Sequence, residues 1–344
     1  MREKRAREGF GPAQYILFSC FTLAAAVLCV CVGSVSVGVR DTLEAVVNAI
    51  EGNSGTGTAS SIIVAVRLPR VICVALVGAA LSLCGAAMQG LLRNPLADGS
   101  TLGVSSGASL GAVLAIAFGF RLPWLASAGT MLMAITFAFA SLVIILTLAY
   151  RLDCTLSTNT IILIGVVFSM FASSLTSIVI SFAGSHVKTI TFWSMGSLAG
   201  SSYSDALILL GSLALFAPVL LCLARELNAF SVGEDNARSI GVNVRRVKLT
   251  VLIAASVLIG VSVSISGTIG FVGLVVPHMT RLIVGPNHKK LLPASMFSGA
   301  SFLMLADLAA RTVISPIELP IGVVTSLVGS LAFVYILYIS RRKA

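Results

Sequence analysis

Residues 249–280 read LTVLIAASVLIGVSVSISGTIGFVGLVVPHMT, a stretch without a charged side chain. About 20 apolar residues are enough for one helix to cross the hydrocarbon core of a bilayer, so this stretch is too long for a single crossing. Serine and glycine residues interrupt it around Ser266. We therefore expect two membrane helices that are separated near that residue.

The rest of the chain has the same character. Of its 344 residues, 57% are hydrophobic and 10% are charged, and the mean hydropathy is +1.02. An ordinary soluble domain has about 25% charged residues. This composition excludes a soluble globular enzyme, a disordered chain and a secreted disulfide scaffold. It predicts an all-α polytopic membrane protein, with residues 1–344 forming one transmembrane domain. The expected ten spans are residues 12–36, 63–91, 101–120, 124–150, 158–183, 205–224, 247–265, 269–285, 291–311 and 319–340.

The distribution of charge supports an even number of spans. The net charge is +10. With ten spans and a cytosolic N-terminus, 17 of the 23 basic residues fall on the cytosolic side, as the positive-inside rule requires. We expect both termini in the cytosol, and no nucleic-acid partner. The first span has a basic start, but its apolar run is too long for a signal peptide, so we expect a retained anchor.

The sequence gives no sign of a metal site or a cofactor. Its seven cysteines are scattered, and no histidine or acidic residue stands near them at the spacing of metal ligands. They indicate no disulfide framework. His278 is alone in an apolar stretch, and we expect it to be packed and hydrogen-bonded rather than to bind a ligand.

The longest cytosolic connection, 225–248, holds a short helical pattern. Acidic residues open it, an arginine follows and a glycine closes it. Two helical turns are marginal in water, so this helix must dock on something. It docks either on its own membrane domain or on a cytosolic partner. The candidate partner contacts are Gly233, Glu234, Asp235, Ala237, Arg238 and Gly241.

The chain carries no energy source that the sequence reveals. It lacks a phosphate-binding P-loop, because no lysine follows a glycine. Only Asp307 lies well inside a predicted span, so the buried acids of a proton relay are missing. A partner that hydrolyses ATP is the favoured source of energy. An ion-coupled secondary carrier stays open as the alternative, since sodium sites can use backbone carbonyls.

Three arginines lie at the outer ends of predicted spans. Arg67 and Arg70 are three residues apart and share a helix face, and Arg311 ends the ninth span. They predict a basic clamp for the carboxylates of an extracytoplasmic partner. Two alternatives remain, namely interfacial snorkelling and an internal pair between Asp307 and Arg311.

Two broken segments stand in corresponding halves of the chain. Residues 90–95 contain glycine and proline and precede a row of glycines that begins at Gly103, and residues 267–273 are rich in glycine and precede Pro277. This pairing hints at the internal repeat of a transporter.

Two patterns of small and polar residues follow the helical repeat. Gly103, Gly107 and Gly111 indicate close helix packing. The hydroxyl groups of a polar stripe on the fifth span either line a hydrated path or donate hydrogen bonds back to their own helix. The stripe comprises Ser169, Ser173, Thr176, Ser177 and Ser181.

These residues resemble the FecCD/BtuC-type permeases, which are membrane subunits of ATP-binding-cassette (ABC) importers for ferric siderophores, haem and vitamin B12. The resemblance runs from about residue 60 to 340. Its motifs are Arg67-Leu-Pro-Arg70, Asn94-Pro-Leu-Ala97, Leu102-Gly-Val-Ser-Ser-Gly107, Gly233-Glu-Asp235, Gly267-Thr-Ile-Gly-Phe-Val-Gly-Leu-Val-Val-Pro-His278 and Glu318-Leu-Pro-Ile-Gly322.

The resemblance implies the type II ABC importer (BtuC-like) fold with ten spans in each of two permease subunits, the same or a paralogous chain. It implies two cytosolic ATP-binding subunits that engage residues 226–244, and an extracytoplasmic binding protein whose acidic residues meet Arg67, Arg70 and Arg311. This chain would then catalyse no reaction of its own. Gly99 and Ser330-Leu331 depart from the usual pattern, in which prolines are common, and this bears on local helix geometry.

The sequence thus predicts a permease subunit in the bacterial cytoplasmic membrane that imports a ferric siderophore by alternating access. The alternative cargoes are vitamin B12, haem and an oxyanion. An ion-coupled carrier and a purely structural subunit are the rival classes.

Overall fold

The computed structural model describes residues 10–33, 44, 58–120 and 128–343. Every regular element in these ranges is a helix. The helices are α1 (Pro12–Cys31), α3 (Thr58–Ile62), the π-helical turn η1 (Ile63–Arg67), α4 (Leu68–Leu92), α5 (Val104–Ala117), α6 (Ala128–Leu152), α7 (Thr158–Phe182), the 3₁₀ turn η2 (Gly184–His186), α8 (Val187–Ser194), α9 (Tyr203–Cys222), α10 (Ala224–Val232), α11 (Glu234–Ser239), α12 (Val244–Ser266), α13 (Val272–Val284), α14 (His288–Thr312) and α15 (Ile321–Lys343).

In the described residues, each of the ten predicted spans overlaps one α-helix over most of its length, and the span 63–91 also contains the π-helical turn η1. Residues 34–36 of the first predicted span and 124–127 of the fourth lie outside the described residues. The expected division of residues 249–280 is present, because α12 ends at Ser266 and α13 begins at Val272. Gly267 and Phe271 both have positive φ angles there, so the backbone leaves the helical conformation at each end of the break. The sequence did not predict α8 and α10, which are shorter than a membrane span.

Seven helices in the described ranges are long and apolar enough to cross a membrane. Helices α5 and α13 are shorter, with 14 and 13 residues. At 1.5 Å per residue they reach about 20 Å, against roughly 30 Å for the hydrocarbon core. The non-helical segments before them, 93–103 and 267–271, must complete the crossing. Such backbone is tolerated in a membrane only where protein or a cavity surrounds it.

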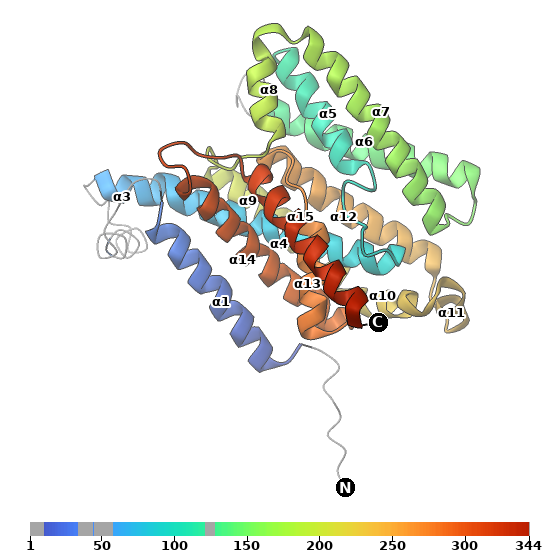
Figure 1. Cartoon of the computed structure of the whole chain (residues 1–344). Coiled ribbons are helices and arrows are strands. Elements are labelled where there is room, and N and C mark those ends of the chain that lie inside the picture. The colour runs from blue at the N-terminus through green and yellow to red at the C-terminus, as the bar shows by residue number, and fades with distance from the viewer. Residues whose placement is uncertain (1–9, 34–43, 45–57, 121–127, 344) are drawn as a thin grey trace.

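Helix α4 is the centre of the molecule. It packs against α14, α13, α12 and α9, and Figure 1 shows it running across the bundle between them. Glycines make the two closest crossings possible. A Cβ atom on Gly78 would overlap the backbone of Gly299 in α14, and one on Gly85 would overlap that of Gly273 in α13. Close approach through small residues is the usual basis of helix association in membranes.

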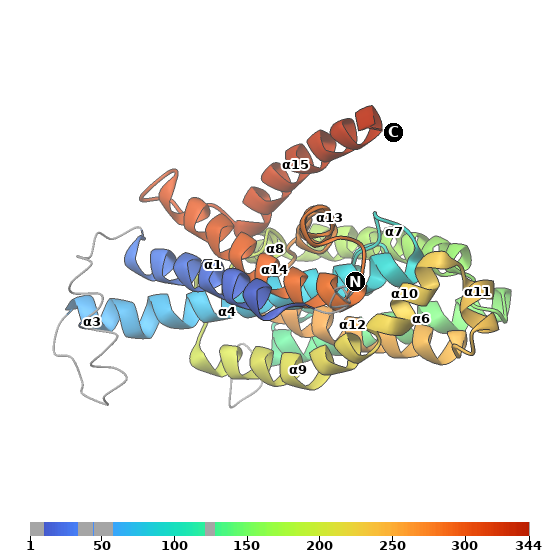
Figure 2. The same cartoon turned by 90° about the horizontal axis from the view of Figure 1, so that it is seen from below.

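Helices α5, α6, α7 and α8 form a second group, at the top of Figure 1. The predicted packing role of the α5 glycines is confirmed, because a Cβ on Gly107 or Gly111 would overlap the backbone of α6. The last helix, α15, packs less extensively for its length than the helices of these two groups. Figure 2 shows α15 leaning away from the other helices, and it packs only on α13 and α14 to any extent.

Candidate functional site

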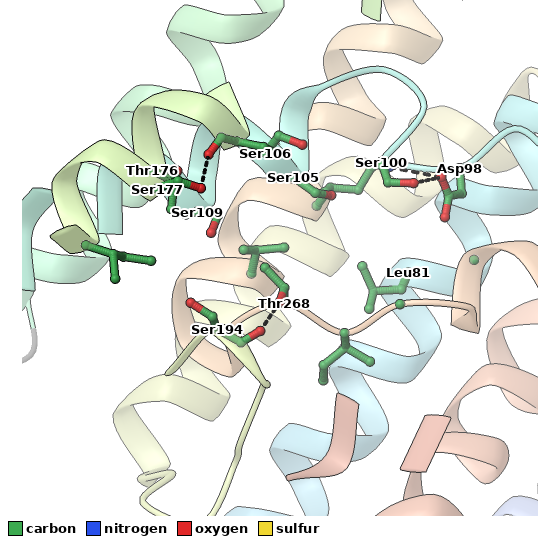
Figure 3. A pocket seen from close by; sticks show the side chains of 18 residues that line it. Leu81, Asp98, Ser100, Ser105, Ser106, Ser109, Thr176, Ser177, Ser194 and Thr268 are labelled. Atoms are coloured by element: carbon green, nitrogen blue, oxygen red, sulfur yellow. Dashed lines mark hydrogen bonds between the residues drawn. The ribbon is translucent and has the colours of Figure 1, made fainter. Parts of the chain in front are cut away.

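In the structure the two breaks extend over residues 93–103 and 267–271, and both broken segments line one cavity of about 460 Å³. Asp98, Gly99 and Ser100 of the first segment lie on one side, and Thr268, Ile269 and Gly270 of the second lie on another. Helices α4 and α12 contribute apolar side chains. Figure 3 shows hydroxyl groups of α5, α7 and the end of α8 directed toward the same space. These hydroxyls belong to Ser105, Ser106, Ser109, Thr176, Ser177 and Ser194.

The polar stripe of α7 divides into two parts. Ser173, Thr176 and Ser177 line the cavity. Ser169 instead donates to the carbonyl oxygens of Gly165 and Ser100, at 2.9 and 3.1 Å, and so ties α7 to the first broken segment. Ser181 donates to the carbonyl of Ser177 and lies outside the cavity lining. The cavity-lining interpretation therefore applies to Ser173, Thr176 and Ser177, and only the interpretation as hydroxyls bonded within the protein applies to Ser169 and Ser181.

Five of the nine hydroxyl groups in the described lining donate to a partner within the chain, and Ser100 is one of them, bonded to Asp98. Ser177 donates to Ser173 O at 3.0 Å, Thr176 to Ala172 O at 2.8 Å, and Ser194 to Ile190 O at 2.8 Å. Thr268 donates to Ser194 O. What these groups present to the cavity is therefore oxygen lone pairs. Asp98 is the one charged residue among the described residues of the lining.

The 225–248 connection folds as the charge pattern predicts. Helix α11 begins after Gly233, where φ is 133°, and ends before Gly241, where φ is 88°. Ala237 is fully buried, so α11 docks on its own chain. Its outer side remains open. Val232 and Ile240, at either end of α11, are 69% and 72% exposed, and Asp235 and Arg238 are exposed beside them.

Glu234 belongs to the docked side of α11 rather than to its open side. Its Oε1 atom accepts a hydrogen bond from Thr158 at 3.0 Å and lies 2.6 Å from the ammonium nitrogen of Lys248. The expectation that the two acids act together at the partner surface therefore needs correction. Asp235 is 98% exposed at its side chain, whereas Glu234 faces the membrane domain.

The three outer arginines are buried, with 4%, 6% and 2% of Arg67, Arg70 and Arg311 exposed. They do not form an open clamp in this conformation. Arg67 donates to the carbonyl oxygens of Val30 and Cys31. These carbonyl oxygens belong to the last turn of α1, where no following helical N–H group is available to donate to them.

Asp307 is the centre of an ion-pair network in the same region. Arg70 donates to its Oδ1 from Nε at 3.1 Å and from Nη2 at 2.9 Å. Arg311 Nε lies 3.2 Å from Oδ2, close enough for an ion pair but not aligned for a hydrogen bond. Arg70 Nη1 also reaches Glu318 at 2.9 Å, and the Glu318 side chain is 34% exposed. The internal Asp307–Arg311 pair, weighed as an alternative, is present.

The model of the FecCD transport family matches residues 21–339 of this chain. The chain belongs to that family. A solved structure titled as an inward-facing conformation of a putative metal-chelate type ABC transporter aligns with a TM-score of 0.84 and 32% identity. It covers 95% of this chain and 99% of its own. The type II importer fold that the sequence predicted is confirmed.

Two curated relatives of this FecCD permease carry informative names. An uncharacterized ABC transporter permease protein of Bacillus subtilis, YvrB, is 45% identical over 283 residues, which are 82% of this chain and 80% of the relative. The cobalamin import system permease protein BtuC of Halobacterium salinarum is 40% identical over 280 residues, 81% and 74% of the two chains. This chain is therefore an ABC importer permease of the cytoplasmic membrane, and the ion-coupled carrier is excluded.

The sequence did not identify two polar residues of this permease as buried. Lys248 was expected to be one of the cytosolic basic residues, yet its side chain is fully buried. Gln89 is 3% exposed and donates to Leu274 O at 3.0 Å, while its Oε1 accepts from Arg281. A polar residue inside an apolar run is the available signal for Gln89, whereas Lys248 stands near Arg245 and Arg246 and has no such signal. His278 is packed as expected, with its ring against Phe333, but neither ring nitrogen has a hydrogen-bond partner in the described part of the chain, so the expected hydrogen bond is absent there.

Proposed function

We propose that this permease carries a ferric siderophore into the cytosol by alternating access. The observation that supports the proposal most directly is the meeting of both broken segments at the hydroxyl-lined cavity. Discontinuous spans that face a cavity near the middle of the membrane are typical of transporter substrate sites. Here the weakly polar wall would let a large solute pass without holding it.

The chemistry of the wall favours a metal chelate over an oxyanion. The five hydroxyls that already donate within the chain offer acceptors, and the carboxylate of Asp98 adds negative charge. No lysine or arginine is among the described residues of the lining. An oxyanion needs positive charge to offset its own, and the described lining supplies none, whereas a chelate encloses the charge of its metal within an organic ligand. Vitamin B12 and haem remain the alternative cargoes, because the family resemblance includes their importers.

The cargo is tested with the binding protein that co-purifies with the permease. That protein is titrated with a ferric siderophore, haem, cobalamin and molybdate, followed by uptake of the tightest ligand into proteoliposomes that contain ATP. The proposal predicts tight binding and ATP-dependent uptake of the ferric siderophore. Selective uptake of one of the other three ligands would reject the siderophore and keep the permease assignment.

A second permease subunit, the same or a paralogous chain, would close the cavity. Helices α7 and α15 both carry rows of exposed apolar side chains, for example Met170 at 67% and Leu327 at 64%. Lipid could also cover such apolar rows. Helix α7, however, also exposes the hydroxyl groups of Ser173 and Ser177 on the side of the cavity, and polar groups there suit a protein partner better than lipid. Cross-linking of single cysteines at residues 170 and 327 between subunits in native membranes tests this arrangement.

Two cytosolic ATP-binding subunits would supply the energy and engage the 225–248 connection, with both chain termini on the same side of the membrane. The open side of α11 suits such a contact, because its exposed Val232 and Ile240 lie outside the apolar spans. Co-purification of a nucleotide-binding subunit that is lost when both residues are changed to serine supports this contact. Retention of the subunit in that variant would count against it.

A binding protein would dock at the opposite end, near the arginine network. Arg70 is the arginine best placed for this, since its partner Glu318 is partly exposed and could yield to a carboxylate of the binding protein. Arg70→Gln should weaken docking, and the loss should be larger at low ionic strength. Equal affinity of the variant and the native chain in low salt would refute the docking role.

A further inference from the structure

A buried ammonium group joins three separate parts of the cytosolic end. Lys248 lies in the first turn or two of α12, and none of its surface is exposed. Its Nζ atom lies 2.6 Å from Glu234 Oε1 of α11 and donates to the carbonyl oxygen of Leu156 at 2.8 Å. The same Oε1 accepts from Thr158, the first residue of α7. One ion pair therefore connects α11, α12 and the start of α7.

The turn that presents the Leu156 carbonyl is itself held in place. Asp153 accepts from the backbone and hydroxyl groups of Thr155 at 2.9 and 2.6 Å, and from the backbone of Ser157 at 3.1 Å. Leu156 has a φ of 52°, an uncommon conformation for a residue with a branched side chain. Backbone conformations of this kind persist only where the surroundings enforce them. The turn thus fixes an acceptor directly opposite Lys248.

Both helices that meet at this junction continue to the cavity. Helix α7 carries Ser173, Thr176 and Ser177, about four to five turns beyond Thr158. Helix α12 carries Ile259 and Val263, three to four turns beyond Lys248. An α-helix is stiff over that distance, so a displacement of α11 that acts on the junction reaches two walls of the cavity together.

We propose that Lys248 is the positioning residue that couples α11 to the cavity, by holding Glu234 against the cytosolic ends of α7 and α12. This role of Lys248 rests on one part of the proposed function, namely that the ATP-binding subunits move α11. Lys248 touches no cargo and acts through the helices that it joins. Its charge matters because a neutral side chain of the same length would fill the space without attracting Glu234 or donating to Leu156.

The first experiment needs the permease alone, in nanodiscs. Hydrogen exchange of the α11 amides is compared between the native chain, Lys248→Met, and Lys248→Arg, which keeps the positive charge and a donor for the Leu156 carbonyl. Arg151→Met is the matched control, since it removes an exposed positive charge near the same turn. We expect exchange in α11 to rise about tenfold or more in Lys248→Met, to stay nearer native in Lys248→Arg, and to stay native in the control.

The second experiment uses the complex with its co-purifying ATP-binding subunits. Ser177→Cys reports on the cavity through its rate of labelling by a maleimide, after the exposed Cys20, Cys154 and Cys222 are changed to alanine. In the native background, ATP with vanadate should change that rate. In Lys248→Met the complex should still hydrolyse ATP, but the labelling rate should no longer respond, whereas Lys248→Arg should keep the response.

The outcomes separate this proposal from the proposed function. A native complex without any nucleotide response at residue 177 would reject the ATP-driven mechanism, whatever Lys248 does in nanodiscs. A native response that Lys248→Met retains in full would overturn the role of Lys248 alone. Unchanged exchange of α11 in Lys248→Met would overturn it as well, because the junction would then not hold the helix.

Discussion

Replacing Asp307 by asparagine should strongly destabilise the folded permease. The carboxylate of Asp307 is the shared partner of Arg70 and Arg311, and the three side chains are 2%, 8% and 3% exposed. Asparagine has nearly the same shape, so the packing is kept while the negative charge is lost. Breaking a buried ion pair on one side typically costs about 3 to 5 kcal/mol, because the remaining charge stays buried. We expect a loss at that level, since two guanidinium groups are affected.

Glu318→Gln provides the matched comparison. This residue pairs with the same Arg70 at 2.9 Å, but its side chain is 34% exposed. Exposed pairs contribute about 0 to 1 kcal/mol, so the variant should lose about 1 kcal/mol at most. The assay is equilibrium unfolding of each purified variant in mixed micelles with increasing SDS. A loss below about 1 kcal/mol for Asp307→Asn, or equal losses for both variants, would refute the reasoning.

Three further predictions concern packing, the cavity and the α6–α7 turn. Gly85→Ala should cost about 1 to 3 kcal/mol in the same unfolding assay because its methyl group meets the backbone of α13, whereas Gly211→Ala, which meets open space, should be nearly neutral. Ser177→Phe should strongly reduce cargo uptake into proteoliposomes by filling the cavity, whereas Ser174→Phe, outside the lining, should leave it close to native. Hydrogen bonds from Ser157 and Thr155 hold the pKa of Asp153 well below its usual range. Its stabilisation of the turn is therefore complete above the ordinary carboxyl pKa of about 4 and is lost as the pH falls through the lowered value. Protection factors of the turn amides, which allow for the pH dependence of intrinsic exchange, should fall between about pH 5 and about pH 2 in the native chain and stay constant in Asp153→Asn.

The sequence was sufficient for the spans because lipid imposes a local rule. Each crossing needs its own run of apolar residues, so the ten spans and the break after Ser266 can be identified without knowledge of any neighbour. The glycines of α5 were also interpretable, since small residues at helical spacing have few other uses in a membrane.

Polar pairing was harder to predict, because it depends on residues that are distant in the chain. Arg70 and Asp307 are 237 positions apart, and an arginine at the end of a span has the same pattern whether it faces water or a buried carboxylate. Lys248 follows two exposed arginines and so resembles a surface charge, although its stem and ammonium are enclosed. A search for charges at helical spacing finds i,i+4 pairs such as Asp307–Arg311 and misses the rest.

The central position of α4 also determines how the permease responds to its bilayer. Together with the turns before it, this helix runs unbroken from Ser60 to Leu92, which is about 50 Å and far longer than the hydrocarbon is thick. A lipid-facing helix of that length would change its tilt with the thickness of the membrane. Since protein surrounds α4 on most sides, its tilt is set by glycine contacts instead. Thinner or thicker lipids should therefore act first on the outer helices, such as α7 and α15, and leave the innermost architecture unaltered.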